Sequence, residues 1–144
     1  MSHEPPVTLT LAHDERTAAI DALRALVRHV LAEEGATAQH VSIVLADHAT
    51  VHELNVAYLD HDYTTDVLSF ALHDDPAQGV EGEVYVDLDT AAERYAEFGT
   101  TYAEEVARYV VHGVLHLLGY DDASDDERAA MRALEDRYLQ ALAT

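Results

Sequence analysis

Residues 106–122 read VARYVVHGVLHLLGYDD and are apolar nearly throughout as far as Leu118. We expect a helix from Tyr102 to Leu118, begun by a capping box of Thr101 and Glu104. A helix that is apolar on nearly every side lies in the centre of a protein rather than on its surface. This segment therefore predicts a buried helix around which the rest of the chain packs.

Three side chains of this segment have the spacing of a metal site. His112 and His116 are four residues apart, so both imidazoles lie on one face of a helix. Gly119 can take a positive φ and end the helix, which turns the chain back and brings Asp122 toward the same point. Three protein ligands with an open fourth position are typical of a catalytic zinc, whereas a structural zinc is closed by four. We predict one zinc ion at His112, His116 and Asp122.

The pattern H-G-x-x-H-x-x-G-x-x-D differs from the H-E-x-x-H-x-x-G-x-x-H of metzincin peptidases. The glutamate of that motif is the general base, and Gly113 cannot replace it. A standard peptidase mechanism is therefore not expected. Two alternatives stay open. The histidines could be hydrogen-bonded core residues without a metal, and Asp121 could take the place of Asp122 as the third ligand.

Composition limits the class of protein. A chain of 144 residues suits one domain, expected over residues 1–144, and its 49% of apolar residues excludes a disordered chain. The absence of cysteine excludes disulfides and thiolate ligands. No apolar run has the length of a membrane span, and the start of the chain lacks the basic region of a signal peptide. We expect a cytoplasmic protein without a membrane partner.

The charge is extreme, with 28 acidic residues, 8 arginines and no lysine, giving a net charge of -20. Such a charge normally argues against a nucleic-acid partner, because binding relies on neutralising phosphates. A dense carboxylate surface also suits a protein that must stay soluble in a salty cytoplasm. At about 1 M salt the Debye length is only about 3 Å, so local contacts decide. The composition is therefore halophilic in character, and its argument against RNA is weakened.

Hydrophobic periodicity predicts the other elements. Strands are expected at Val7–Leu11, Val41–Ala46, Val67–Leu72 and Glu83–Leu88. Further helices are expected from Asp14 or Glu15 to Glu34, and at Thr50–Leu59, Thr90–Phe98 and Ser124 to about Leu142. The pattern predicts a single α+β domain with a four-stranded mixed sheet and about five helices, with the metal motif on a buried helix.

Three segments resemble a known family. His112 to Asp121 match the fixed positions of H-G-x-L-H-L-x-G-Y-D-H; L-N-x-x-Y and T-D-V-L-S-F appear at 54–58 and 65–70, and a variant of G-D-I-x-I at 82–86. Along the chain these elements come in the order of the family, and over about residues 40 to 140 the chain resembles the YbeY family of metal-dependent endoribonucleases. The resemblance implies a zinc-dependent single-strand endoribonuclease of 16S rRNA maturation and ribosome quality control. It implies rRNA as the substrate, and the ribosome or small-subunit assembly factors as partners.

Two positions depart from the family pattern. Asp122 stands in place of the third histidine ligand, and Leu59 in place of the arginine that usually follows the tyrosine. A branch of the family is similar in both respects, so the paired change indicates a variant site rather than an inactive one. The resemblance implies zinc held by His112, His116 and Asp122, with the fourth position open to water or a substrate phosphate.

Other candidate residues follow from the matched segments. Glu83 is a candidate general base, or an ordinary charge of a strand. His61 could supply a donor or a titratable group near neutral pH, or be a solvated loop residue. Arg94 or Arg108 could replace the missing arginine. The candidate substrate-binding residues are Asn55, Thr65, Asp66 and Ser69.

Three functions remain from different classes. The first is the zinc-dependent endoribonuclease. The second is a metallohydrolase of another substrate, such as a peptide, which the absence of a glutamate at Gly113 disfavours. The third is a metal-stabilised binding module in ribosome assembly with little chemistry of its own. A peptidase assay and an RNA cleavage assay would separate the three.

Overall fold

The computed structural model of the protein describes residues 6–59, 67–72 and 79–143, and it contains a four-stranded sheet. The strands are β1 (Val7–Ala12), β2 (Ala38–Ala46), β3 (Val67–Ala71) and β4 (Val80–Asp87), in the order β1-β2-β4-β3. The first two strands and β4 are parallel, whereas β3 is antiparallel to β4. The predicted four-stranded mixed sheet is confirmed.

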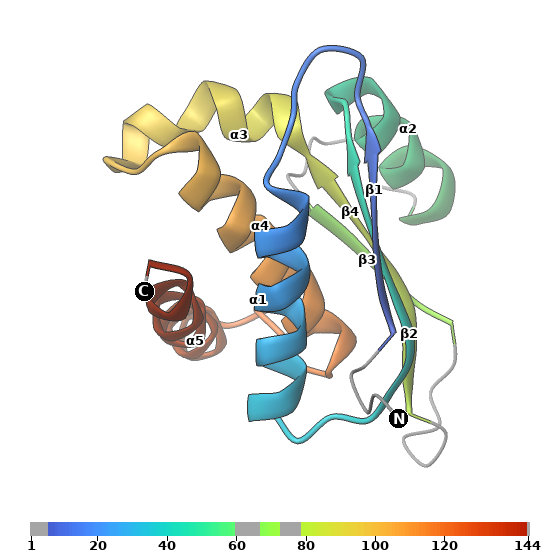
Figure 1. Ribbon diagram of the computed structural model, residues 1–144, viewed down its shortest axis with the longest axis vertical. Helices are drawn as coiled ribbons and strands as arrows, with labels where there is room; N and C mark the ends of the chain where they lie inside the picture. Colours follow the sequence, from blue (N-terminus) through green and yellow to red (C-terminus); the bar gives the residue numbers. More distant parts are fainter. Residues whose placement is uncertain (1–5, 60–66, 73–78, 144) are drawn as a thin grey trace.

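Helices cover both faces of this sheet unequally (Figure 1). They are α1 (Ile20–Glu33), α2 (His48–Leu59), α3 (Leu88–Arg94), α4 (Tyr102–Leu117) and α5 (Asp125–Ala143), with a 3-10 turn, η2, at Tyr95–Phe98. One face carries α1 and α4, with α5 packed outside them, and the other face carries α2. The α+β class with five helices is therefore confirmed. Within the described residues, none of these helices is both long and apolar enough to cross a membrane.

The central helix is α4, as its apolar sequence predicts. It packs against β3 and β4 as well as against α1, α3 and α5. Its buried residues occupy most of its circumference: Glu105, Val106, Ala107, Tyr109, Val110, Val111, Gly113, Val114 and Leu115. The main core lies between this helix, α1 and the sheet, and it includes Val41, Ile43 and Leu45 of β2. The metal motif therefore lies on the most enclosed helix of the fold.

Gly113 lets α4 approach the sheet closely. A Cβ at this position would lie 2.4 Å from Val84 Cγ1 and 3.0 Å from Val67 Cγ2. Position 113 thus faces the sheet rather than solvent, and a larger side chain there would push the helix away. This packing explains in physical terms why the chain has no glutamate after His112.

The start of α1 differs from the prediction. The sequence predicts a helix from Asp14 or Glu15, whereas α1 begins at Ile20. The backbone N–H groups of Glu15 and Arg16 donate to His13 Nδ1 at 3.1 and 3.0 Å, and Arg16 also pairs with Asp89 Oδ1 at 2.8 Å. These contacts fix a loop in place of the first helical turn, because the tertiary partner at Asp89 outweighs local helical preference.

The junction after β4 also differs. The predicted strand continued through Leu88, but β4 ends at Asp87 and α3 begins directly at Leu88. The Asp87 side chain accepts a hydrogen bond from Thr90 N at 2.9 Å, which makes it the N-cap of the helix. The apolar Leu88 is buried in the core from this helix rather than from a strand.

Candidate metal centre

The turn after α4 brings three predicted ligand atoms together. Gly119 has φ +103°, and Tyr120 N donates to Leu115 O at 3.1 Å, so the helix ends as the glycine predicts. His112 Nε2 lies 3.0 Å from His116 Nε2. Asp122 Oδ2 lies 3.4 Å from the first of these nitrogens and 3.5 Å from the second. The three atoms therefore form a nearly equilateral triangle.

This triangle fits a tetrahedral metal ion. Zinc binds imidazole nitrogen and carboxylate oxygen at about 2.0–2.2 Å, so two ligand atoms of a tetrahedron are about 3.3–3.6 Å apart. The three side chains are 24%, 28% and 38% exposed, which leaves one side open to a substrate. Among the described residues, His112, His116 and Asp122 form the one group of three with this geometry. The residues present fit a divalent metal with an open coordination position.

A buried carboxylate fixes the orientation of His112. His112 Nδ1 donates to Glu135 Oε2 at 2.7 Å, which leaves the Nε2 lone pair directed at the metal position. Glu135 lies on α5 and is only 5% exposed. Metal-binding histidines commonly donate their second ring nitrogen to such a carboxylate, and the contact favours the tautomer that binds metal.

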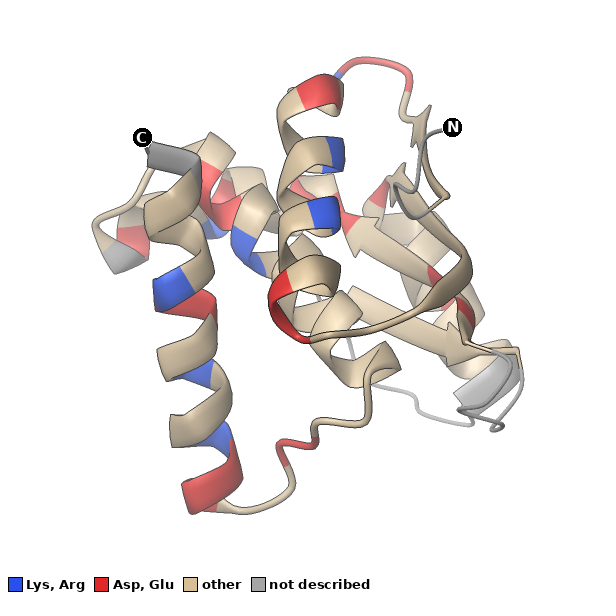
Figure 2. Ribbon diagram, turned by 60° about the horizontal axis from the view of Figure 1, so that its bottom comes forward, with Lys and Arg blue, Asp and Glu red and all other residues tan. Residues whose placement is uncertain are grey.

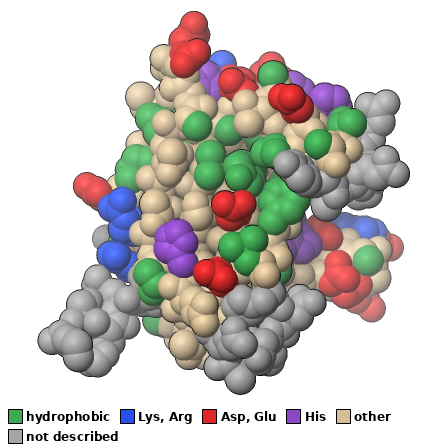
Figure 3. All heavy atoms as spheres, turned by 90° about the vertical axis from the view of Figure 1, so that its right-hand side faces the viewer, with side chains coloured by type: hydrophobic (Ala, Val, Ile, Leu, Met, Phe, Trp, Pro, Cys, Tyr) green, Lys and Arg blue, Asp and Glu red, His purple; other side chains and the backbone are tan. Residues whose placement is uncertain are grey.

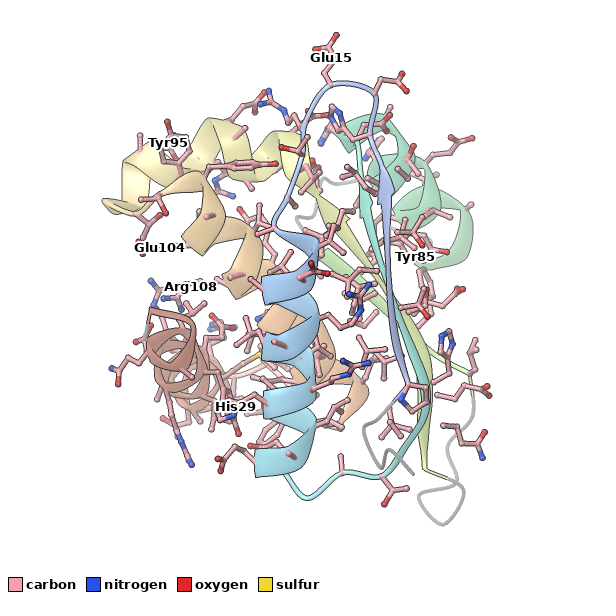
Figure 4. The ribbon with its side chains drawn as sticks, in the orientation of Figure 1. Glu15, His29, Tyr85, Tyr95, Glu104 and Arg108 are labelled. Carbon is pink, nitrogen blue, oxygen red and sulfur yellow. The ribbon has the colours of Figure 1, made fainter. Side chains whose placement is uncertain are left out.

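Arg108, one turn before His112 on α4, forms an ion pair with this carboxylate. Its Nη1 donates to Glu135 Oε1 at 3.0 Å and its Nη2 to Asp136 Oδ1 at 2.6 Å. Burial opposes the charge of Arg108, but the hydrogen bonds that it donates to Asp136 and Glu135 outweigh burial and raise the pKa of the guanidinium. Figure 4 shows Arg108 projecting from α4 on the side of α5. The arginine therefore joins the two helices beside the metal group.

Asp121 supports the turn rather than entering the group. Its Oδ1 accepts a hydrogen bond from Asp122 N at 2.8 Å. Arg128 Nη1 donates to Asp122 O at 3.2 Å from the first turn of α5, which is itself capped by Ser124. These contacts hold the backbone of Asp122 in place while its carboxylate stays directed at the two histidines.

The other predicted site residues lie at different distances from this group. Ser69 Oγ donates to Gly113 O at 2.8 Å, so it ties β3 to α4 next to His112. Asn55 is 1% exposed on α2, on the other side of the sheet. His61, Thr65 and Asp66 lie outside the described residues.

Glu83 lies on the sheet face opposite α4. Tyr85 OH donates to its Oε1 at 3.3 Å, and the ring of Tyr85 packs edge-on against Phe70 with centroids 5.8 Å apart. Figure 4 shows Tyr85 on the α2 side of the sheet, whereas Val84 faces Gly113 of α4. In Figure 3, which views this face, apolar side chains gather at the centre with carboxylates among them. The fold therefore does not bring Glu83 and the three ligands together.

A cavity of about 390 Å³ opens beside the metal group. His112 and Asp122 line it together with Glu135 of α5, and Arg94 and Arg108 also line it. The two arginines considered as replacements for the missing family arginine thus reach the same cavity. Sequence reasoning missed Glu135, because its contact with His112 joins residues 23 positions apart on two different helices. The one sequence signal that could have indicated Glu135 is its place on the same face of α5 as Arg128 and Met131.

Comparison with known proteins identifies the family of this chain. A family model described as Endoribonuclease YbeY matches residues 10–143. A Salinibacter ruber protein of that name is 52% identical over 99% of this chain and 96% of its own length. A Chlorobium phaeovibrioides protein of the same name is 40% identical over 94% and 91%. A solution structure from Thermotoga maritima superposes with a TM-score of 0.68 at 28% identity, covering 94% of this chain and 88% of that one. The chain belongs to the YbeY family of endoribonucleases.

Proposed function

We propose that the protein is a zinc-dependent endoribonuclease that cleaves single-stranded rRNA in 16S rRNA maturation and ribosome quality control. The observation that carries the proposal is the triangle of His112, His116 and Asp122, with edges of 3.0–3.5 Å, at the mouth of a cavity that arginines line. A metal with an open position beside cationic side chains suits a phosphodiester substrate.

We propose a separate role for each residue of the site. His112, His116 and Asp122 would hold the ion, and a bound zinc would act as a Lewis acid toward a phosphoryl oxygen. Glu135 keeps the His112 ring in the tautomer and orientation needed for binding. Arg108 holds the Glu135 carboxylate in place through a hydrogen bond to its other oxygen. Ser69 holds β3 against the helix that carries both histidines.

For the general base we propose His61 before Glu83, since Glu83 lies across the sheet from the three ligands. Asn55, Thr65, Asp66 and Ser69 are proposed to shape the substrate cleft or to hold its loop. His61→Gln and Glu83→Gln, each assayed for RNA cleavage with zinc affinity measured in parallel, test the two bases.

The alternatives have less support. Position 113 packs against Val84 and Val67, so no side chain there can serve a peptidase mechanism. Failure of the zinc-loaded protein to digest casein would agree with the absence of a peptidase mechanism.

We also propose a cytoplasmic location and contact with the ribosome or its small-subunit assembly factors. Co-sedimentation with small ribosomal subunits would test the contact.

The decisive assay is cleavage of a single-stranded rRNA fragment. The zinc-loaded protein is expected to cleave it, a chelator to abolish cleavage, and added zinc to restore it. Asp122→Ala serves as the inactive control. Cleavage that persists in the chelated protein and in Asp122→Ala would contradict the proposal, and so would zinc binding without any cleavage, as expected of a binding module.

A further inference from the structure

Half of the arginines of this acidic chain gather at one cavity. Four of its eight basic residues line the cavity beside the metal group: Arg94, Arg108, Arg128 and Arg132. Figure 2 shows basic segments on the helices, and β1–β4 contain no arginine. With a net charge of -20, the protein repels phosphates at long range, so local contacts must attract them.

Most of these arginines are already engaged. Arg108 pairs with Glu135 and Asp136, Arg128 with Asp125, and Arg94 with Glu97. All eight arginines of the chain lie within the described residues. Among these eight, Arg132 is the one without a hydrogen bond or ion pair in the structure described. A cation left without an internal partner at the mouth of a metal site is available to an anionic ligand.

The geometry of α5 places Arg132 on the side of the cavity. Arg128, Arg132 and Glu135 recur at i, i+4 and i+7, which is one face of a helix. Met131 and Glu135 are buried on this face, whereas Arg132 is exposed. Since Glu135 contacts the His112 ring and Asp122 lines the same cavity, Arg132 lies at the rim of the space that the ligands adjoin.

The chemistry of this rim fits a phosphodiester. A guanidinium presents a planar pair of donors that matches two phosphate oxygens, and an exposed one binds them at a small desolvation cost. We propose that Arg132 binds a backbone phosphate of the RNA next to the one that reaches the metal group. This inference rests on the proposed function and adds to it a specific contact to the substrate strand.

RNA binding by Arg132→Gln tests this contact, with Arg137→Gln as a matched control. Arg137 is on the same helix and carries the same charge, but it pairs with Glu33 of α1 at 3.6 Å and lies outside the residues that line the cavity. Zinc-loaded parent and variants are titrated with a short labelled oligouridylate, and a gel verifies after each titration that the RNA is intact. The melting temperature of each variant controls for folding.

Arg132→Gln is expected to bind this RNA about 10-fold more weakly than the parent. Its slope of log affinity against log salt should be more positive than that of the parent by about 0.7, because one phosphate contact to a single strand is lost. Arg132→Lys should restore the slope, and Arg137→Gln should match the parent in both. Equal effects of the glutamine variants at positions 132 and 137 would overturn the proposal. So would binding of inorganic phosphate as tight as that of RNA at equal phosphate concentration.

Cleavage of the same RNA separates this inference from the proposed function. If the parent cleaves the RNA but Arg132→Gln binds it as Arg137→Gln does, the phosphate contact is wrong and the nuclease function stands. If the parent binds the RNA through Arg132 without cleaving it, the contact stands and the proposed function fails.

Discussion

Asp122 gives this centre a negative charge that a histidine would not bring. Its carboxylate lies 3.4 and 3.5 Å from the two imidazole nitrogens, while Asp121 only supports the turn. We expect Asp122→Ala to lower zinc affinity by about two orders of magnitude or more, since two histidines alone rarely hold a catalytic zinc. Asp122→His should keep zinc, because imidazole reaches a similar distance.

The zinc affinities of Asp122→Ala and Asp122→His are measured by competition against a chelator of known affinity. Asp121→Asn is the control, because the amide oxygen can still accept the hydrogen bond from Asp122 N. If Asp121→Asn loses as much zinc affinity as Asp122→Ala, the third ligand is at position 121 and the centre must be redrawn.

The hydrogen bond from His112 to Glu135 should be visible in metal affinity. Glu135→Gln replaces an anionic acceptor with a neutral one, and loss of such a supporting contact commonly weakens metal binding about 10-fold. Asp136→Asn is the matched control, because Asp136 also pairs with Arg108 but does not touch His112. Equal zinc affinities of Glu135→Gln and Asp136→Asn would show that Glu135 acts only through the link between α4 and α5.

Asp89 should make part of the stability depend on pH. Burial opposes its charge, but hydrogen bonds from His48 N, Arg16 and His13 lower its pKa to about 2. Because the folded pKa lies below the ordinary value of 3.8, the stabilisation is present above about pH 4 and is lost as the pH falls toward 2.

Asp89→Asn is therefore expected to cost about 1–2 kcal/mol at neutral pH and progressively less toward pH 2. Urea unfolding at several pH values measures the difference. Asp14→Asn, a change at an exposed carboxyl in the loop whose His13 and Arg16 contact Asp89, is the matched control for the loss of one negative charge. A destabilisation by Asp89→Asn that stays constant down to pH 2 would count against the assigned pKa.

At the scale of elements, the contact of α4 with the sheet depends on Gly113. In a helix, alanine is ordinarily favoured over glycine by about 1 kcal/mol. Here its Cβ would lie 2.4 Å from Val84 Cγ1, so we expect Gly113→Ala to destabilise the protein by about 2 kcal/mol. Urea unfolding of Gly113→Ala and Gly113→Ala/Val84→Ala tests this. If adding Val84→Ala recovers none of the free energy of unfolding that Gly113→Ala loses, steric packing is not the cause of the destabilisation.

The elements show what sequence can and cannot predict. The spacing of His112, His116 and Asp122 is local, so helix geometry and one glycine turn suffice to bring them together. The N-terminus of α1 could not be predicted in this way, because the contacts of His13 and Arg16 with Asp89 join residues more than 70 positions apart. Glu83 was assigned to the right strand, but the face it occupies depends on where α4 packs.

Over the whole molecule, the charge predicts an unusual response to salt. With a net charge of -20 and no lysine, the protein repels RNA at low ionic strength, and screening removes most of this repulsion. We expect the rate of RNA cleavage by the zinc-loaded protein to rise from low to high salt. Rates on one rRNA fragment across that range test it, and a steady fall from low salt would show that the cavity arginines dominate instead.

The chemistry proposed for this protein depends on a metal ion held by His112, His116 and Asp122. Anomalous scattering from crystals of the protein supplied with zinc tests it most directly. We expect one zinc peak about 2.0–2.2 Å from His112 Nε2, His116 Nε2 and a carboxylate oxygen of Asp122. A structure with zinc supplied in which no ion lies between the histidines, or in which Asp122 points to solvent, would contradict it.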